Sequence, residues 1–104
     1  MKVVQLVLFE SGLSDDDIRR TIEERAPQYR ALPGLLQKLY LRDEETGEYG
    51  GLYIWKDEES LRAFRGSELA RTIPDAYRVE GGPRRETAEV ISVLREDAGL
   101  QLAA

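Results

Sequence analysis

Residues 32–64 read LPGLLQKLYLRDEETGEYGGLYIWKDEESLRAF, and this stretch decides the fold. It begins with a Pro-Gly pair, which predicts the end of a preceding helix. Two strand-like runs, 35–42 and 49–56, flank an acidic turn whose Gly47 can adopt a positive φ angle. Asp57 then caps an acidic helix start. The stretch therefore predicts a β-hairpin that leads into a helix.

Alternation along the two strands separates their faces. In strand 35–42, Lys38 and Tyr40 fall on the same face. One face of strand 49–56 carries Gly51, Tyr53 and Trp55. The glycine pair 50–51 predicts either a bulge or a point where another backbone or a ligand comes close. A bulge there would shift the register by one residue and turn Lys38 away from the aromatic face.

The turn between these strands is rich in acidic residues. A cation site would use the carboxylates of Asp43, Glu44, Glu45 and Glu48. A solvated hairpin turn built around Thr46-Gly47 is the favoured alternative.

The chain before the hairpin predicts a strand and a helix. Residues 2–9 are apolar on both faces with Gln5 as the interruption, which is typical of a strand covered on both sides. Ser14, followed by three aspartates, predicts a helix start. An apolar stripe recurs every four residues at Ile18, Ile22 and Ala26. Pro27 predicts a kink or a tighter turn near the end of this helix.

The chain after the hairpin is less regular. Ser67 predicts the cap of a second short helical piece, which Pro74 ends. Residues 77–83 predict a turn-rich connection or a short edge segment, and the β-branched run 87–94 predicts the last strand. The tail 96–104 is expected to fray or to pack on a partner subunit.

The element order β, α, β, β, α, β predicts a single α+β domain over residues 1–104 with a ferredoxin-like fold. Four antiparallel strands would carry two helices on one face. The first, second and last strands are apolar on both faces: in the first, Val4, Leu6 and Leu8 oppose Val3, Val7 and Phe9. A monomer would expose one of these apolar surfaces, so the sequence predicts a homodimer formed through the sheet.

Composition excludes several kinds of chemistry. The chain has no cysteine, histidine or asparagine, which removes thiolate and imidazole catalysis and nearly all zinc, haem and non-haem iron sites. We therefore expect no metal, haem or flavin cofactor. A net charge of −5 disfavours nucleic acid and anionic membranes as partners. A small neutral or aromatic ligand fits this charge better. Because the chain shows neither a signal-peptide pattern nor a long apolar run, a cytoplasmic location is expected.

The hairpin also carries a family resemblance. The quoted features are the Pro-Gly stop, Lys38, the Thr-Gly-Glu turn, Gly-Gly-x-Tyr-x-Trp and Asp-Glu-x-Ser. This pattern resembles a small monooxygenase-like family within the dimeric α+β barrel superfamily of antibiotic-biosynthesis-type monooxygenases. The resemblance covers Leu32 to about Pro74 closely and the rest of the chain in outline.

The resemblance implies a cofactor-independent monooxygenase that acts on a small phenolic or quinol-like compound. In such enzymes the deprotonated substrate itself reduces dioxygen, and the protein supplies an apolar pocket and groups that stabilise an anion. The implied catalytic residues are Lys38, Tyr53 and Trp55. The implied substrate-binding residues are Tyr40, Gly51, Phe64 and Arg71.

Structural roles compete with these assignments. Tyr53 and Trp55 would also serve as core aromatics, Lys38 could extend its ammonium to the sheet edge, and Arg65 and Arg71 could be solvated. Two further functions therefore remain open: a non-catalytic module that binds a small hydrophobic compound, and a domain whose main role is dimerisation. A pocket of roughly 300 Å³ or more, lined by Tyr or Trp and one cation, would disfavour the last of these.

Overall fold

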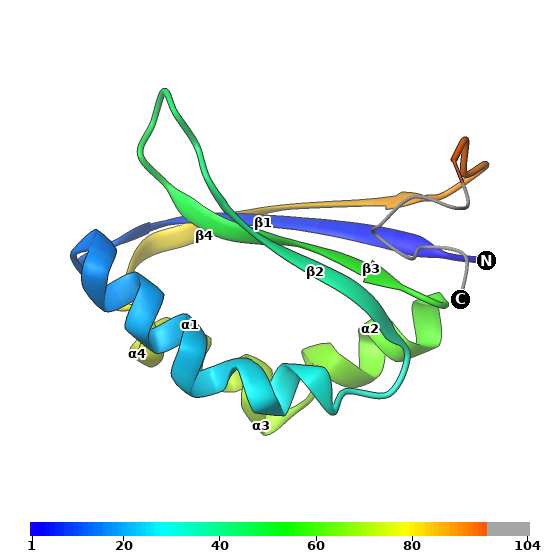
Figure 1. The fold of residues 1–104 in the computed structure, drawn as a ribbon, viewed down its shortest axis with the longest axis horizontal. Helices are drawn as coiled ribbons and strands as arrows, with labels where there is room; N and C mark the ends of the chain where they lie inside the picture. The colour runs from blue at the N-terminus through cyan, green and yellow to red at the C-terminus, as the bar shows by residue number, and fades with distance from the viewer. Residues whose placement is uncertain (96–104) are drawn as a thin grey trace.

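The computed structural model describes residues 1–95 and shows a four-stranded antiparallel sheet with helices on one face (Figure 1). In chain order the elements are β1 (Val3–Ser11), α1 (Asp15–Arg30), β2 (Leu35–Arg42), β3 (Tyr49–Trp55), α2 (Glu58–Arg65), α3 (Glu68–Arg71), α4 (Ile73–Ala76) and β4 (Val79–Glu89). The strands lie in the order β2-β3-β1-β4, so the first and last strands are neighbours. This arrangement confirms the predicted ferredoxin-like fold.

Three helices begin at the predicted capping residues. The Ser14 hydroxyl accepts a hydrogen bond from the backbone N–H of Asp17 at 3.2 Å. The Asp57 carboxylate accepts one from the N–H of Ser60 at 2.8 Å, and Ser67 caps α3 in the same way. Each cap satisfies an N–H group that the first helical turn leaves unpaired.

The two prolines of the helical segments take different positions. Pro27 lies inside α1, which continues to Arg30 and therefore ends before the Pro-Gly pair. Pro74 does not end a helical piece, as the sequence predicted, but lies in the first turn of α4. That prediction was wrong because a proline in the first turn lacks only an N–H that would have no helical partner there.

The last strand lies earlier in the chain than predicted. β4 pairs with β1 over Val79–Glu89. The predicted strand over 87–94 is therefore correct as far as Glu89 and wrong for residues 90–94. The glycines and proline at 81–83, predicted as turn residues, lie inside β4. β4 is an edge strand, where proline is tolerated, and the register shifts between Leu8 and Glu10 of β1 opposite this segment.

The register of the hairpin places Lys38 on the aromatic face. Lys38 pairs with Tyr53, and Tyr40 pairs with Gly51. The shift in this pair of strands lies at residues 35–37, at the beginning of β2. A bulge at the glycine pair was therefore a wrong prediction, and the alternation of side chains runs through it unbroken.

The alternative for the glycine pair, a close approach of other atoms, is confirmed. A Cβ atom on Gly50 would collide with the carbonyl oxygen of Val7. A Cβ atom on Gly51 would lie 3.2 Å from Cε of Lys38 and 3.4 Å from a ring carbon of Tyr53. The first glycine therefore makes room for backbone, and the second makes room for side chains above the sheet.

We call the sheet surface that carries the helices the inner face. It contributes to a core cluster that contains Val3, Tyr29, Tyr53, Trp55, Leu61 and Phe64. A second cluster contains Phe9, Ile18 and Tyr77. Both clusters join strand residues to helix residues, so they fix the distance between the two layers.

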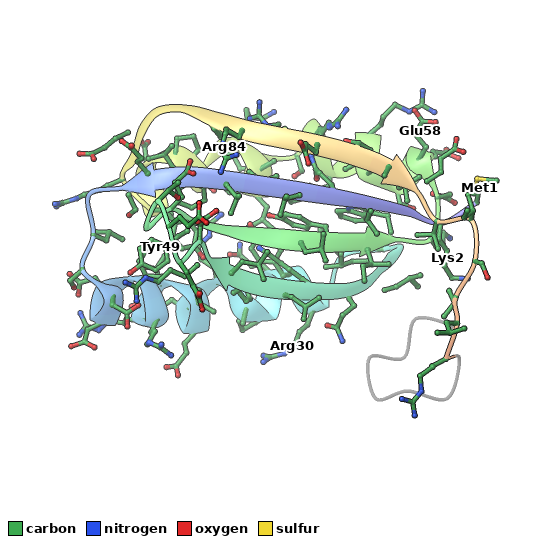
Figure 2. All side chains as sticks on the ribbon, turned by 90° about the horizontal axis from the view of Figure 1, so that it is seen from above. Met1, Lys2, Arg30, Tyr49, Glu58 and Arg84 are labelled. Atoms are coloured by element: carbon green, nitrogen blue, oxygen red, sulfur yellow. The ribbon has the colours of Figure 1, made fainter. Side chains whose placement is uncertain are left out.

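We call the opposite sheet surface the outer face. Strand pairing brings together Val4, Leu6, Leu39, Leu52 and Ile54 on it. Figure 2 looks onto the sheet and shows the four strands side by side, with β2 and β4 at its edges. The prediction of two apolar faces is confirmed for β1 but wrong for β4, because the residues of β4 paired with Val4 and Leu6 are Ala88 and Glu86.

The acidic turn is occupied by its own interactions. The Asp43 carboxylate accepts hydrogen bonds from the backbone N–H groups of Glu45 and Thr46 at 2.9 and 3.1 Å. Glu48 pairs with Arg84 of β4 at 2.7 Å, near one end of the sheet (Figure 2). Within residues 1–95 no group of three or more acidic side chains is arranged to hold a metal ion. The structure therefore favours a solvated turn.

Two further expectations concern the ends and the surroundings of the chain. The tail 96–104, which was expected to fray or to pack on a partner subunit, lies outside the described residues. Across residues 1–95, every helix is too short or too polar to cross a membrane.

Candidate active site

A cavity of about 690 Å³ lies between the inner face and the helices. Its walls include tyrosines from both layers and the amine of Lys38. The volume exceeds the roughly 300 Å³ above which a core filled entirely by its own side chains is disfavoured. It lies in the usual range for small-molecule sites.

Two rows of paired residues cross the inner face beneath this cavity. The first row consists of Lys38, Tyr53, Gln5 and Thr87. The second row consists of Tyr40, Gly51, Val7 and Arg85. The centre of the second row holds small side chains, so there is open space above it, bordered by the larger side chains of the first row.

Lys38 lies inside a group of three tyrosine rings. Its Nζ is 3.5 Å from the ring centroid of Tyr29, 4.4 Å from that of Tyr40 and 4.5 Å from that of Tyr53. Within residues 1–95, no carboxylate pairs with this amine and no side chain accepts a hydrogen bond from it. The amine is therefore held by ring faces alone, at the wall of the cavity.

The environment of Lys38 makes its amine easy to deprotonate. Burial, and then the nearby charge of Arg25, lower the pKa of Lys38 from its ordinary 10.5 to about 7. The tyrosine faces attract the ammonium but do not replace its hydration. Near neutral pH the site therefore holds both the ammonium and the neutral amine.

Arg25 of α1 lies behind the tyrosines. Its guanidinium is 6.0 Å from the ring centroid of Tyr29 and 5.9 Å from that of Tyr77. It donates hydrogen bonds to the carbonyl of Leu69 at 2.9 Å and to the hydroxyl of Thr72 at 3.2 Å. Arg25 thus ties α1 to the short helices and places a fixed positive charge near the amine.

Tyr53 and Trp55 form a stack at the C-terminal end of β3. The rings are nearly parallel, at 5°, with centroids 6.0 Å apart. Burial, and then the neighbouring Tyr29, raise the pKa of Tyr53, so this phenol stays neutral. Trp55 is fully buried and lies behind Tyr53 rather than at the cavity surface. Its Nε1 has no hydrogen-bond partner in the described part of the chain.

The remaining predicted site residues all line the cavity. Phe64 of α2 is buried and its ring centroid lies 5.4 Å from that of Tyr53. Tyr40 and Gly51 are paired neighbours in the second row. Arg71 lies on α3, where it pairs with Glu68 at 2.7 Å and is largely exposed. The structure therefore brings Lys38, Tyr40, Tyr53 and Phe64 together and leaves Arg71 at the periphery.

Among the cavity residues missed from the sequence are Tyr29, Tyr77 and Gln5. Each is buried, and each has a side-chain oxygen without a hydrogen-bond partner among the described residues. A signal existed for two of them. Tyr29 lies seven residues after Ile22, so it continues the apolar stripe of α1, and Gln5 is the polar interruption of an apolar strand.

One family model matches most of the length of the chain. The family model described as "Putative mono-oxygenase ydhR" matches residues 4–76 of the 104 residues. This range contains β1 except for its first residue, the hairpin and all four helices. The comparison with curated proteins finds no match.

Solved structures share the fold at low sequence identity. NE2512, a protein of unknown function from Nitrosomonas europaea, superposes with a TM-score of 0.71 and 17% identity over 88% of this chain and 91% of that one. SnoaB, a cofactor-independent oxygenase from Streptomyces nogalater, has a TM-score of 0.71 and 15% identity, with coverages of 89% and 96%. A dimeric ferredoxin-like protein of unknown function from Jannaschia sp. CCS1 has a TM-score of 0.69 and 17% identity, with coverages of 86% and 100%. At these identities the likeness establishes the fold.

Proposed function

Because the chain belongs to the ydhR mono-oxygenase family, we propose that it is a cofactor-independent monooxygenase of a small phenolic or quinol-like compound. The observation that carries this proposal is the amine of Lys38, held by three tyrosine rings at the wall of a cavity and free of any carboxylate partner in residues 1–95. SnoaB, which shares the fold, is an oxygenase that uses no cofactor, and this supports the same kind of chemistry here.

The proposed reaction begins with a proton transfer. The neutral amine of Lys38 takes the proton of the substrate hydroxyl, and the resulting ammonium lies next to the phenolate. The phenolate transfers one electron to dioxygen, and the two radicals combine into a peroxide at a ring carbon. The Lys38 ammonium returns its proton to this peroxide, which becomes a hydroperoxide and leaves the amine neutral again. Loss of water gives a quinone. A phenol and one dioxygen thus yield a quinone and one water, and the substrate supplies all the electrons.

The other residues hold the substrate and exclude water. Tyr29, Tyr40 and Tyr53 offer ring faces against which an aromatic substrate can pack. Trp55 and Phe64 support Tyr53 from behind and from the helix side. Gly51 leaves the space that the substrate ring would occupy, and water exclusion there strengthens the attraction between ammonium and phenolate.

A non-catalytic binding function is the second candidate. The same cavity would sequester an aromatic compound without turnover, and the lack of histidine and asparagine leaves Lys38 and the tyrosines as the polar groups available for chemistry. Binding of a phenol without any oxygen uptake would support this candidate. A role limited to dimerisation is disfavoured by the cavity itself.

We also propose that the protein is a homodimer formed through the outer face. The apolar side chains that strand pairing gathers there have no helix layer over them. Structures with the same fold from Thermobifida fusca and Jannaschia sp. CCS1 are described as dimeric ferredoxin-like proteins. A stable interface of this kind buries more than ~1,000 Å². Sedimentation of a stable 11.8 kDa monomer at micromolar concentration would contradict this proposal.

Oxygen uptake with a panel of phenols and hydroquinones tests the enzymatic proposal. We expect turnover with at least one of them, one atom of ¹⁸O₂ in the product, and a rate that rises as the pH rises through about 7, where Lys38 becomes neutral. Lys38→Met should lower the rate by ~100-fold or more, as is usual for loss of a general base. Lys56→Met is the matched control and should leave the rate unchanged. Equal turnover in the Lys38→Met variant would overturn the assignment.

A further inference from the structure

The charges around the cavity are all of one sign. The chain has 20 acidic and 15 basic residues, yet no aspartate or glutamate is among the described residues that line the cavity. The basic residues that line it are Lys38, Arg65, Arg71 and Arg85. In a protein with a net charge of −5, this segregation gives the cavity a positive field, with Lys38 at its wall and the three exposed arginines at its rim.

Two of these arginines lack a carboxylate partner. Arg71 is neutralised by Glu68. The guanidinium of Arg65 donates a hydrogen bond to the hydroxyl of Thr87 at 3.3 Å, which leaves its charge uncompensated. Arg85 forms neither an ion pair nor a hydrogen bond with any residue in the range 1–95.

Arg65 and Arg85 both lie on the β4 side of the cavity. Arg85 and Thr87 are alternate residues of β4, so their side chains leave the same face of the sheet. Arg65 reaches Thr87 from α2. Lys38 lies at the other edge, on β2, and three strand spacings of ~4.8 Å place the two edges ~14 Å apart at the backbone. Cations therefore stand at both ends of the cavity, with aromatic rings between them.

Gln5 provides an independent sign of a polar ligand. It is 3% exposed and lies on β1, between the two cationic ends. Gln5 lines the cavity, and its buried Oε1 has no hydrogen-bond partner among the described residues. Leaving a buried polar atom unpaired destabilises the folded protein. A ligand with a hydrogen-bond donor that reaches this oxygen would remove that penalty.

We propose that the ligand is an aromatic hydroxy acid, and that Arg65 and Arg85 form a carboxylate subsite at the β4 end of the cavity. The phenol end lies at Lys38, the ring lies along the tyrosines, and the carboxylate lies between the two guanidinium groups. This inference rests on the proposed use of the cavity for a phenolic substrate and adds the second functional group. Guanidinium groups suit this task because they bind carboxylates with two parallel hydrogen bonds.

A matched pair of probes tests the subsite: 6-hydroxy-2-naphthoate and 2-naphthol. They share the phenolic bicycle, and only the first carries a carboxylate, at the far end of the ring. Calorimetry at pH 7.5 in the absence of dioxygen should show the naphthoate binding at least ~10-fold more tightly, with the advantage shrinking as salt is added. In the Arg65→Met/Arg85→Met variant the two probes should bind within about twofold of each other.

Arg84→Met is the matched control, because Arg84 is the neighbour of Arg85 on the other face of β4 and pairs with Glu48. It should keep the ~10-fold preference. If the Arg65→Met/Arg85→Met variant binds 2-naphthol with wild-type affinity, the variant is folded. If that affinity falls, the Arg65→Gln/Arg85→Gln variant is used in its place. Equal affinities in the wild type, a preference retained in both double variants, or no millimolar binding of either probe would each overturn the subsite.

The binding experiment is separate from the test of turnover. A carboxylate preference that depends on the two arginines, with no oxygen uptake for any phenol, would support the subsite and contradict the monooxygenase. Oxygen uptake that depends on Lys38, with equal affinities for both probes, would do the reverse.

Discussion

The inner and outer faces of the sheet share one backbone but carry side chains of different chemical character. On β1 and β3 the inner face carries Gln5 and Tyr53, while their immediate neighbours Leu6 and Leu52 form part of the outer face. The inner face gathers the amine, the phenols and the unpaired polar atoms, and the outer face gathers aliphatic side chains. Because side chains alternate along a strand, a single set of residues supplies two surfaces with separate tasks.

The contrast shows how the protein tolerates polar groups that a packed core would not. Buried oxygens of Gln5, Tyr29 and Tyr77 lack partners in residues 1–95, and all three residues line the cavity. The outer face has no such groups at its centre, which suits close packing against a second copy. We therefore interpret the inner face as the chemical surface and the outer face as the assembly surface.

The largest expected effect comes from placing a charge on the outer face. Leu52→Asp should weaken the proposed dimer ~1,000-fold or more, because burying an unpaired carboxylate costs several kcal/mol. Light scattering should then give the single-chain mass of 11.8 kDa with an unchanged circular dichroism spectrum. Lys38→Met, a change on the inner face, should leave the mass at twice that value. A dimer that survives Leu52→Asp would mean that the outer face is not the interface.

The second effect separates the two adjacent glycines. Gly50→Ala should lower the free energy of unfolding by ~2–3 kcal/mol, since the new methyl group collides with the backbone oxygen of Val7. Gly51→Ala should change it by less than about 1 kcal/mol, because the atoms it meets belong to the side chains of Lys38 and Tyr53. Gly51→Ala should nevertheless weaken phenol binding, since it narrows the cavity. Urea denaturation of both variants checks this order, and equal losses would contradict it.

Local signals explain why the hairpin and the helix caps were predictable. The bounds of β2 match the sequence interpretation, and Ser14, Asp57 and Ser67 cap helices as expected. Each of these features depends on residues that are close in sequence. β4 was misplaced because its pairing depends on distant β1, and an edge strand accepts the polar residues, glycines and proline that normally mark a turn.

The candidate site was predictable where it lies within the hairpin. The pairing of Lys38 with Tyr53 follows from strand alternation once the register is known. Tyr29 and Arg85 reach the cavity from α1 and β4, so their contribution depends on how the layers pack. The apolar stripe of α1 marks Tyr29 as a core-facing residue, but no local pattern shows that Tyr29 or Arg85 reaches the cavity.

The third effect concerns pH and is smaller. The pKa of Lys38 is about 7 in the folded protein and 10.5 in an unfolded chain. Between these values the unfolded state binds the extra proton, so the free energy of unfolding should rise with pH. From pH 7 to 9 the rise due to Lys38 should be about 2 kcal/mol. Lys38→Met should lack this rise, and Lys56→Met should keep it. If the free energy of unfolding had the same pH dependence in wild type and in Lys38→Met, this would contradict a pKa of Lys38 lowered by burial.

The protonation state of Lys38 is the measurement that tests the account most directly. The chain has three lysines, Lys2, Lys38 and Lys56, so a sample with ¹³C-labelled lysine side chains gives few Cε signals to assign by NMR. We predict one signal that titrates with a pKa of about 7 and is missing from the Lys38→Met variant. If every lysine signal of the wild-type protein titrated above about pH 9, the inner face would hold an ordinary ammonium and the proposed general base would not exist.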